Sequence, residues 1–105
     1  MDEKYGNAMQ IIMHAGNAKS AAMMAMDAAA EGDFEQAEQQ LSEARDEMRA
    51  AHQVQFDLVH AEANGESVEV NIILVHAQDH LTMAIMAIDF AERFISLYKK
   101  VDAKE

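Results

Sequence analysis

The hydrophobic positions of the chain fall into three long segments with a helical repeat. From about residue 3 to residue 31, apolar residues recur every three or four positions, as at Ile12, Ala15, Ala22, Met26 and Ala29. The same spacing continues over about 33–64 and again over about 67–100. Apolar residues at this spacing lie on one face of an α-helix. We therefore predict three helices over these ranges.

Residues typical of helix ends separate the three segments. Gly32 suits the position just after a helix, and Asp33 suits the first position of the next. Asn64 and Gly65 end the second segment, and Ser67 is a candidate N-cap for the third. Short connections between long helices place the helices antiparallel to their neighbours. The expected fold class is all-α, an up-down-up bundle.

The third segment carries more apolar surface than a three-helix bundle can bury. One stripe interrupted by polar residues comprises Ile72, Met83, Met86, Phe90, Phe94, Leu97 and Val101. A second stripe comprises Val70, Ile73, Leu74, Ala77, Leu81, Ala84, Ile88 and Ile95. A surface helix needs one apolar stripe about 100° wide. One of the two stripes therefore calls for a second chain, and we expect a homo-oligomer; a thick helix inside a monomer is the alternative.

Length and composition narrow the class of protein. The 105 residues suit a single domain over 1–105, and they include no cysteine, so disulfides and thiolate metal sites are excluded. No apolar run is long enough to span a membrane, and the N-terminal residues do not resemble a signal peptide, so we expect a cytoplasmic protein. A net charge of −11 disfavours nucleic acid and anionic membranes as partners. It favours a basic partner protein or a divalent cation, although solubility alone also explains it.

Two histidines and a carboxylate interrupt the first stripe of the third segment. His76, Asp79 and His80 share one helix face at about 100° per residue. In an antiparallel pair of helices, Gln55 is level with His76 and His52 is level with Asp79. His52 and Gln55 therefore either join the site or face solvent.

Spacing alone leaves three interpretations of these residues open. Two histidines four residues apart often bind zinc, with Asp79 as a third ligand. Alternatively, one imidazole is a nucleophile that holds a phosphoryl group, and His80, Gln78 and the pair His52 and Gln55 supply hydrogen-bond donors. The third interpretation is that the histidines are structural. A serine-type catalytic triad is less favoured because no strained turn presents a nucleophile.

The string Val75-His76-Ala77-Gln78-Asp79-His80-Leu81 resembles the active-site segment of the lactose/cellobiose-type enzyme IIA of the bacterial sugar phosphotransferase system. Three further segments are similar to family segments in the same order: 15–20 (Ala-Gly-Asn-Ala-Lys-Ser), 32–34 (Gly-Asp-Phe) and 51–55 (Ala-His-Gln-Val-Gln). The resemblance covers nearly the whole chain. The segment around His76 is specific, whereas the shorter matches are weak by themselves.

The resemblance implies a homotrimer of three-helix subunits and a phosphoryl-transfer function. It implies that His76 accepts a phosphoryl group from a histidine of the phosphocarrier protein HPr and passes it to a cysteine of a IIB component. The IIB component then serves the uptake of a disaccharide of the cellobiose, lactose or diacetylchitobiose type. It further implies that Asp79 from each subunit meets near the three-fold axis and holds a divalent cation, commonly magnesium.

The sequence departs from the family at one place. Thr82-Met83 stands where the family has Met-Thr, which moves the hydroxyl toward the solvated side and leaves its role open. The alternative to a phosphoryl carrier is a non-enzymatic metal-binding or scaffold protein that uses His76, Asp79 and His80.

Overall fold

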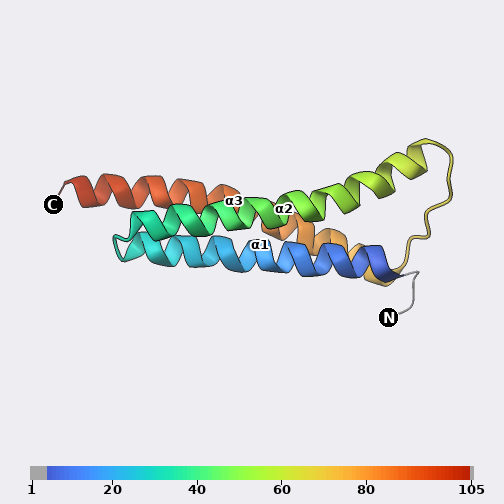
Figure 1. Cartoon of the computed structure of the whole chain (residues 1–105), viewed down its shortest axis with the longest axis horizontal. Coiled ribbons are helices and arrows are strands. Elements are labelled where there is room, and N and C mark those ends of the chain that lie inside the picture. Colours follow the sequence, from blue (N-terminus) through green and yellow to red (C-terminus); the bar gives the residue numbers. More distant parts are fainter. Residues whose placement is uncertain (1–4, 105) are drawn as a thin grey trace.

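The protein is a bundle of three long helices. The computed structural model describes residues 5–104. Helix α1 spans Gly6–Ala30, α2 spans Phe34–Ala63 and α3 spans Ile72–Ala103, and residues 5–104 contain no strand. The chain runs along α1, returns along α2 and runs again in the α1 direction along α3, in a body of 57 × 26 × 19 Å (Figure 1). The predicted all-α, up-down-up bundle is confirmed.

The turn between α1 and α2 forms where the sequence predicts it. Gly32 has a φ of +81°, a conformation that glycine adopts without steric cost, and the backbone N–H of Asp33 donates to the carbonyl of Ala28 at 3.0 Å. The Asp33 carboxylate then accepts the backbone N–H of Gln36 at 3.1 Å and caps α2. The predicted start of the first helix at Glu3 lies outside the described residues.

The predicted start of the third helix at about residue 67 is wrong. Helix α3 begins at Ile72, because Asn71 and not Ser67 is its N-cap; the Asn71 side chain accepts the backbone N–H of Leu74 at 2.9 Å. The end of α2 diverges from α3, so the loop that connects them must bridge the separation between the two helix ends (Figure 1). Extended residues span about 3.3 Å each, against 1.5 Å in a helix, so residues 66–71 reach α3 only by staying extended.

Helix α1 is the centre of packing. It contacts both α2 and α3 along much of their length, whereas α2 and α3 touch over a shorter stretch. Most buried residues are alanines, with five larger side chains at Ile11, Leu41, Leu81, Ile88 and Ile95. Alanine lets helix backbones approach closely, but it buries little apolar area per residue. The single chain therefore has a thin core.

Of the two apolar stripes on α3, the structure buries only one. Leu81, Ile88 and Ile95 belong to the buried stripe and face the bundle core. The other stripe stays exposed, and we call it the exposed stripe: Ile72, Met83, Met86, Phe90, Phe94, Leu97 and Val101. Asp79 and His76 lie along it. Val70, which periodicity placed in the buried stripe, lies in the connection and is 70% exposed.

Candidate functional site

The candidate site occupies the second and third turns of α3. The Asn71 cap fixes where α3 begins, and the helical repeat then sets the directions of the side chains that follow. His76 and Asp79 are exposed, whereas His80, one turn after His76, is half-buried. The predicted grouping of these three residues on one face follows directly from the helix.

His76 and His80 contact each other through their imidazole rings. The two Nε2 atoms lie 3.0 Å apart, and the ring centroids are 4.5 Å apart with the planes nearly perpendicular at 85°. A hydrogen bond between two Nε2 atoms needs one N–H and one lone pair. The two rings can therefore pair as donor and acceptor, and a histidine nucleophile uses such a nitrogen lone pair.

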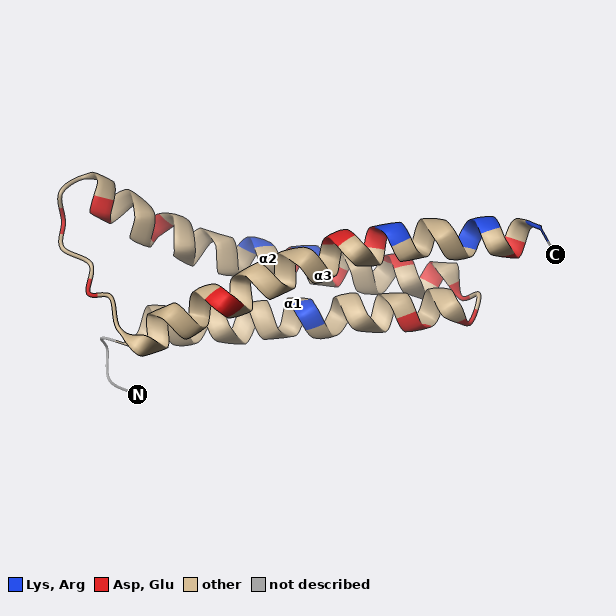
Figure 2. Cartoon of the chain, turned by 180° about the vertical axis from the view of Figure 1, so that it is seen from behind, with Lys and Arg blue, Asp and Glu red and all other residues tan. Residues whose placement is uncertain are grey.

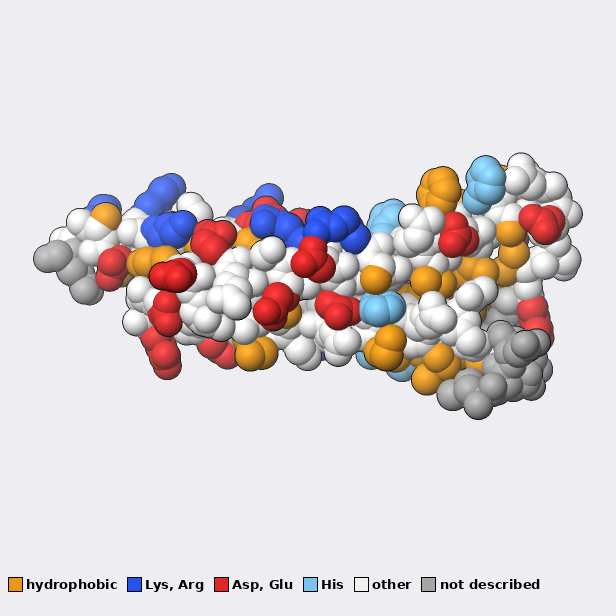
Figure 3. Space-filling model, viewed as in Figure 1, with side chains coloured by type: hydrophobic (Ala, Val, Ile, Leu, Met, Phe, Trp, Pro, Cys, Tyr) orange, Lys and Arg blue, Asp and Glu red, His pale blue; other side chains and the backbone are white. Residues whose placement is uncertain are grey.

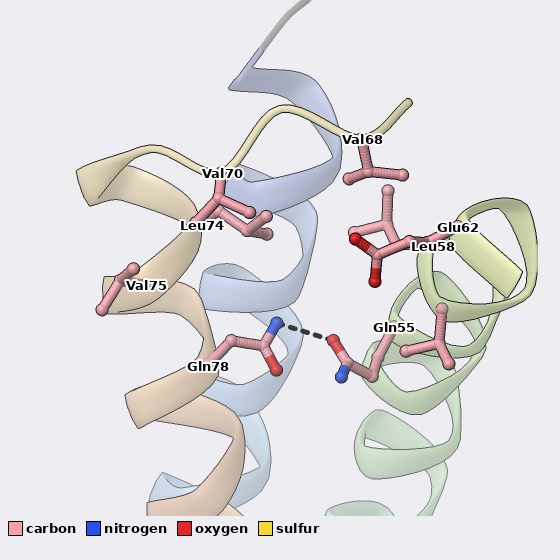
Figure 4. Close-up of a pocket in the computed structure, with 9 residues that line it drawn as sticks. Gln55, Leu58, Glu62, Val68, Val70, Leu74, Val75 and Gln78 are labelled. Carbon is pink, nitrogen blue, oxygen red and sulfur yellow. Dashed lines mark hydrogen bonds between the residues drawn. The ribbon is translucent and has the colours of Figure 1, made fainter. Parts of the chain in front are cut away.

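The polar residues of α2 reach α3 at a different point. The side-chain amide of Gln78 donates to the Gln55 carbonyl at 2.6 Å, and both residues are half-buried (Figure 4). The sequence placed Gln55 level with His76, and its side chain instead bonds Gln78, two residues further along α3. Gln78 lies about 200° around the helix from His76, so in one chain its amide faces α2 and not the histidine pair. His52 is exposed, and among residues 5–104 no hydrogen bond joins it to His76 or Asp79.

A zinc site within one chain does not form in the described part of the protein. Among residues 5–104, no three histidine or acidic side chains are close enough together to hold a metal ion. His76 and His80 face each other, and Asp79 lies exposed beside the exposed stripe. Within residues 5–104 of one chain, the metal-binding alternative therefore has no set of ligands.

A cavity that the periodicity did not predict opens between the end of α2 and the start of α3. Its volume is about 190 Å³. We call it the valine pocket; it is lined by Gln55, Leu58, Val59, Glu62, Val68, Val70, Leu74, Val75 and Gln78 (Figure 4). The sequence signal was the pair Val68 and Val70 in the connection, two apolar residues where a surface loop requires none.

Charges are distributed unevenly along the bundle. From residue 50 to residue 92 the chain contains no lysine or arginine. Among residues 5–104, the end formed by the α2–α3 connection therefore carries acidic residues without basic ones, and basic residues lie toward the other end (Figure 2). In the space-filling view the same trend appears, with blue side chains away from the α2–α3 connection (Figure 3). A partner that approaches this end meets a negative, partly apolar surface.

Comparison with known proteins agrees with the fold. Residues 6–99 match the family described as "PTS system, Lactose/Cellobiose specific IIA subunit". The chain is 46% identical to the lichenan-specific phosphotransferase enzyme IIA component of Bacillus subtilis (strain 168), over 88% of this chain and 84% of that protein.

Two solved structures are similar over nearly their whole length. The cellobiose-specific enzyme IIA from Bacillus anthracis superposes with a TM-score of 0.96 at 39% identity, covering 100% of this chain and 96% of the other. The IIA(Chitobiose) component in complex with HPr from Escherichia coli gives a TM-score of 0.81 at 32% identity, covering 97% and 99%. No described helix is long and apolar enough to cross a membrane. The chain belongs to the lactose/cellobiose-specific IIA family of the sugar phosphotransferase system and is a phosphoryl-carrier component of that system.

Proposed function

We propose that His76 is the phosphoryl acceptor of this IIA component. The observation that supports it is the contact between the histidines: His76 is exposed to a partner, and its Nε2 lies 3.0 Å from the Nε2 of half-buried His80. An exposed imidazole can reach the phosphoryl group of another protein. The more buried ring beside it can orient the nucleophile and then donate to a phosphoryl oxygen.

Two displacement steps follow in this proposal. In the first, a nitrogen of His76 attacks the phosphorus of a phosphohistidine on HPr; the new N–P bond forms as the old one breaks, and the HPr nitrogen keeps the electron pair. In the second, a cysteine sulfur of the IIB component attacks the same phosphorus, and the His76 nitrogen leaves. The phosphoryl group is bound to a protein side chain before and after each step. Catalysis therefore consists mainly of positioning the reacting side chains and stabilising the phosphoryl oxygens.

His80 supplies the nearest hydrogen-bond donor in this scheme. Within one chain the Gln78 amide bonds Gln55 and faces away from His76, so Gln78 and Gln55 could act as supporting donors only across a subunit contact. His52 on α2 is a secondary candidate. The transported sugar is of the cellobiose, lactose or diacetylchitobiose type. Phosphoenolpyruvate, the phosphoryl source of this series of transfers, is an intracellular metabolite. We therefore propose that the protein acts in the cytoplasm.

We further propose that the protein acts as a homotrimer assembled through α3. The exposed stripe is the argument: seven large apolar side chains, all at least 42% exposed, follow one face of α3 over almost its full length. An apolar face of this length, interrupted at His76 and Asp79, is unusual on a monomer, and association through it would give each subunit the larger core that its alanine-rich interior lacks.

Asp79 is proposed to hold a divalent cation, expected to be Mg²⁺, at the trimer axis. The fit rests on the chemistry and place of the residue: an exposed carboxylate beside the exposed stripe would meet its two copies in the trimer. Hard divalent cations bind oxygen ligands. A cation there would offset the repulsion of the three carboxylates, and no step of phosphoryl transfer passes through it.

Incubation with phosphoenolpyruvate, enzyme I and HPr tests the assignment. The wild-type protein is expected to gain one acid-labile phosphate per chain, and His76→Ala none, with unchanged helix content. His60→Ala is the matched control, because His60 is an exposed histidine on α2 away from the pair. A scaffold or metal-binding protein would gain no phosphate in any variant. Full phosphorylation of His76→Ala would refute the assignment.

A further inference from the structure

The two parts of α2 are held to the bundle differently. In the first part, up to residue 51, four side chains are buried: Ala37, Leu41, Ala44 and Ala51. Three side-chain contacts also bind this part to its neighbours: Glu38 with Lys99, Arg45 with Glu92 and Glu47 with His14. We call residues 52–63 the α2 arm. None of its residues is buried, and in the described part of the chain its one side-chain bond to another helix joins Gln55 to Gln78 at 2.6 Å. The α2 arm is therefore the weakly held end of the helix.

The α2 arm faces α3 across an apolar space that water can enter. Leu58 and Val59 on the arm and Leu74 on α3 line the valine pocket, whose volume is about 190 Å³ (Figure 4). Val59 is 55% exposed, and Val70 in the connection is 70% exposed. Apolar side chains lose contact with water when they meet, which is favourable. A movement of the arm toward α3 would therefore gain burial that the open arrangement lacks.

A small bend of α2 is enough for this movement. The Gln78–Gln55 bond ties the two helices at one level, and beyond it the last turns of α2 lean away from α3 (Figure 1). Residues 50–54 contain no glycine or proline, so the helix can curve there but has no site for a sharp kink. The arm is about 18 Å long at about 1.5 Å per residue, so a bend of about 20° moves its tip by about 6 Å. A movement of that size is enough to bring facing side chains into contact.

Acidic side chains oppose the closing movement. Glu62 on the arm lines the pocket, and Glu66 and Glu69 lie in the connection beside it. No lysine or arginine occurs between residues 50 and 92 to neutralise them. Like charges that come closer together repel each other, and salt screens the repulsion. Apolar burial thus favours closing, whereas charge repulsion favours the open arrangement.

We propose that the α2 arm is a lid, which pivots about the Gln55–Gln78 bond and closes over the valine pocket. Closing packs the apolar side chains of the arm against those of α3 and of the connection. Val75 and Gln78 line the pocket and are close to His76 in sequence, so the position of the lid changes the surface near the candidate phosphoryl acceptor. The lid movement itself does not depend on phosphoryl transfer.

Distances between two spin labels in one chain test the lid directly. The chain contains no cysteine, so labels attach only at introduced ones. The test pair is His60→Cys on the arm with Thr82→Cys on α3. The control pair is Glu43→Cys, on the firmly held part of α2, with the same Thr82→Cys, and all three positions are exposed. Labelled chains are mixed with an excess of unlabelled protein, so that distances between subunits do not contribute. We expect two distances for the test pair, which differ by up to about 6 Å, and a single distance for the control pair.

Two substitutions in the test pair examine the pivot. Gln55→Leu removes the bond to Gln78, and we expect it to replace the two distances by one broad distribution. Gln53→Leu is the matched control, because the Gln53 amide bonds Asp57 on the same helix at 2.9 Å. This variant should keep the two distances of the parent pair.

Salt tests the charge argument on the same labelled protein. Raising the ionic strength should enlarge the population with the shorter distance, because salt screens the repulsion between the acidic side chains. Glu62→Gln and Glu69→Gln together should enlarge it already at low ionic strength. A shorter-distance population that shrinks in either case would contradict the charge argument.

Hydrogen exchange of the unlabelled wild-type protein gives an independent measurement. Backbone amides of residues 56–63 are expected to exchange at least about tenfold faster than those of residues 37–51, because opening of the arm exposes no buried side chain. Equal exchange rates would overturn the lid, since the arm would then be held as firmly as the rest of α2, whether by its own chain or by a neighbouring subunit. A single narrow distance for both label pairs would overturn it as well. Unchanged distances in Gln55→Leu would show that the pivot is wrongly assigned.

Discussion

Replacing Phe90 by alanine should weaken the proposed trimer much more than it weakens the fold of one chain. Phe90 lies in the middle of the exposed stripe and is 48% exposed in the single chain. Its own bundle already covers the other half of the ring. The exposed half is therefore available to a second subunit, and truncating it removes contacts between chains.

The size of the effect follows from area. A phenylalanine buries about 150–250 Å² in full, so about 100 Å² of Phe90 remains for the interface. At about 25 cal/mol per Å², and after allowing for the alanine that stays, the loss is about 2 kcal/mol per subunit. Three subunits lose about 6 kcal/mol, which corresponds to about four powers of ten in the trimer dissociation constant.

Sedimentation equilibrium from micromolar to nanomolar concentration measures this change directly. Wild-type protein should have about three times the chain mass at micromolar concentration, and Phe90→Ala should dissociate at much higher concentration. Met24→Ala is the matched control, since Met24 is equally exposed but lies on α1 outside the exposed stripe. A wild-type monomer at micromolar concentration, or equal dissociation constants for all three proteins, would refute the reasoning.

Three further predictions address the site and the fold. His80→Ala should slow phosphorylation of His76 about 10- to 150-fold without abolishing it, because a hydrogen bond to a charged group contributes about 1.5–3 kcal/mol; complete loss in a rapid-quench assay would give His80 a larger role. Asp79→Leu should form a trimer that melts at the same or a higher temperature and no longer responds to a chelator, since buried charges are often replaceable by apolar groups; dissociation to monomers would contradict the axial-cation proposal. Asp33→Ala should lower the free energy of unfolding by about 1 kcal/mol in urea denaturation, through loss of the α2 cap; an unchanged midpoint and slope would show that the cap bond does not stabilise the fold.

Local features of the sequence were sufficient to predict the three helices and the placement of His76 and His80 on one helix face. Gly32 and Asp33 act within one turn of the chain, so their effect on the end of α1 and the start of α2 needs no distant contact. The same holds for His76 and His80. Once the segment is helical, residues four apart lie one above the other, and their rings meet.

The start of α3 was not determined locally. Ser67 and Asn71 are both acceptable N-caps, and propensity alone does not choose between them. The choice depends on how far α2 leans away from α3, because that distance decides how many residues must stay extended. The valine pocket has the same origin, since it exists only where the end of α2 and the start of α3 diverge.

The two apolar stripes of α3 show most clearly what the sequence by itself determined and what only the tertiary structure decided. Periodicity determined that α3 has two apolar faces and that His76 and Asp79 lie along one of them, because the helical repeat sets these directions within a single element. Only the packing of α1 and α2 decided that the face with Leu81 and Ile88 is buried. Both faces are apolar enough to form a core, so the choice came from which one fits the alanine-lined surfaces of the other two helices.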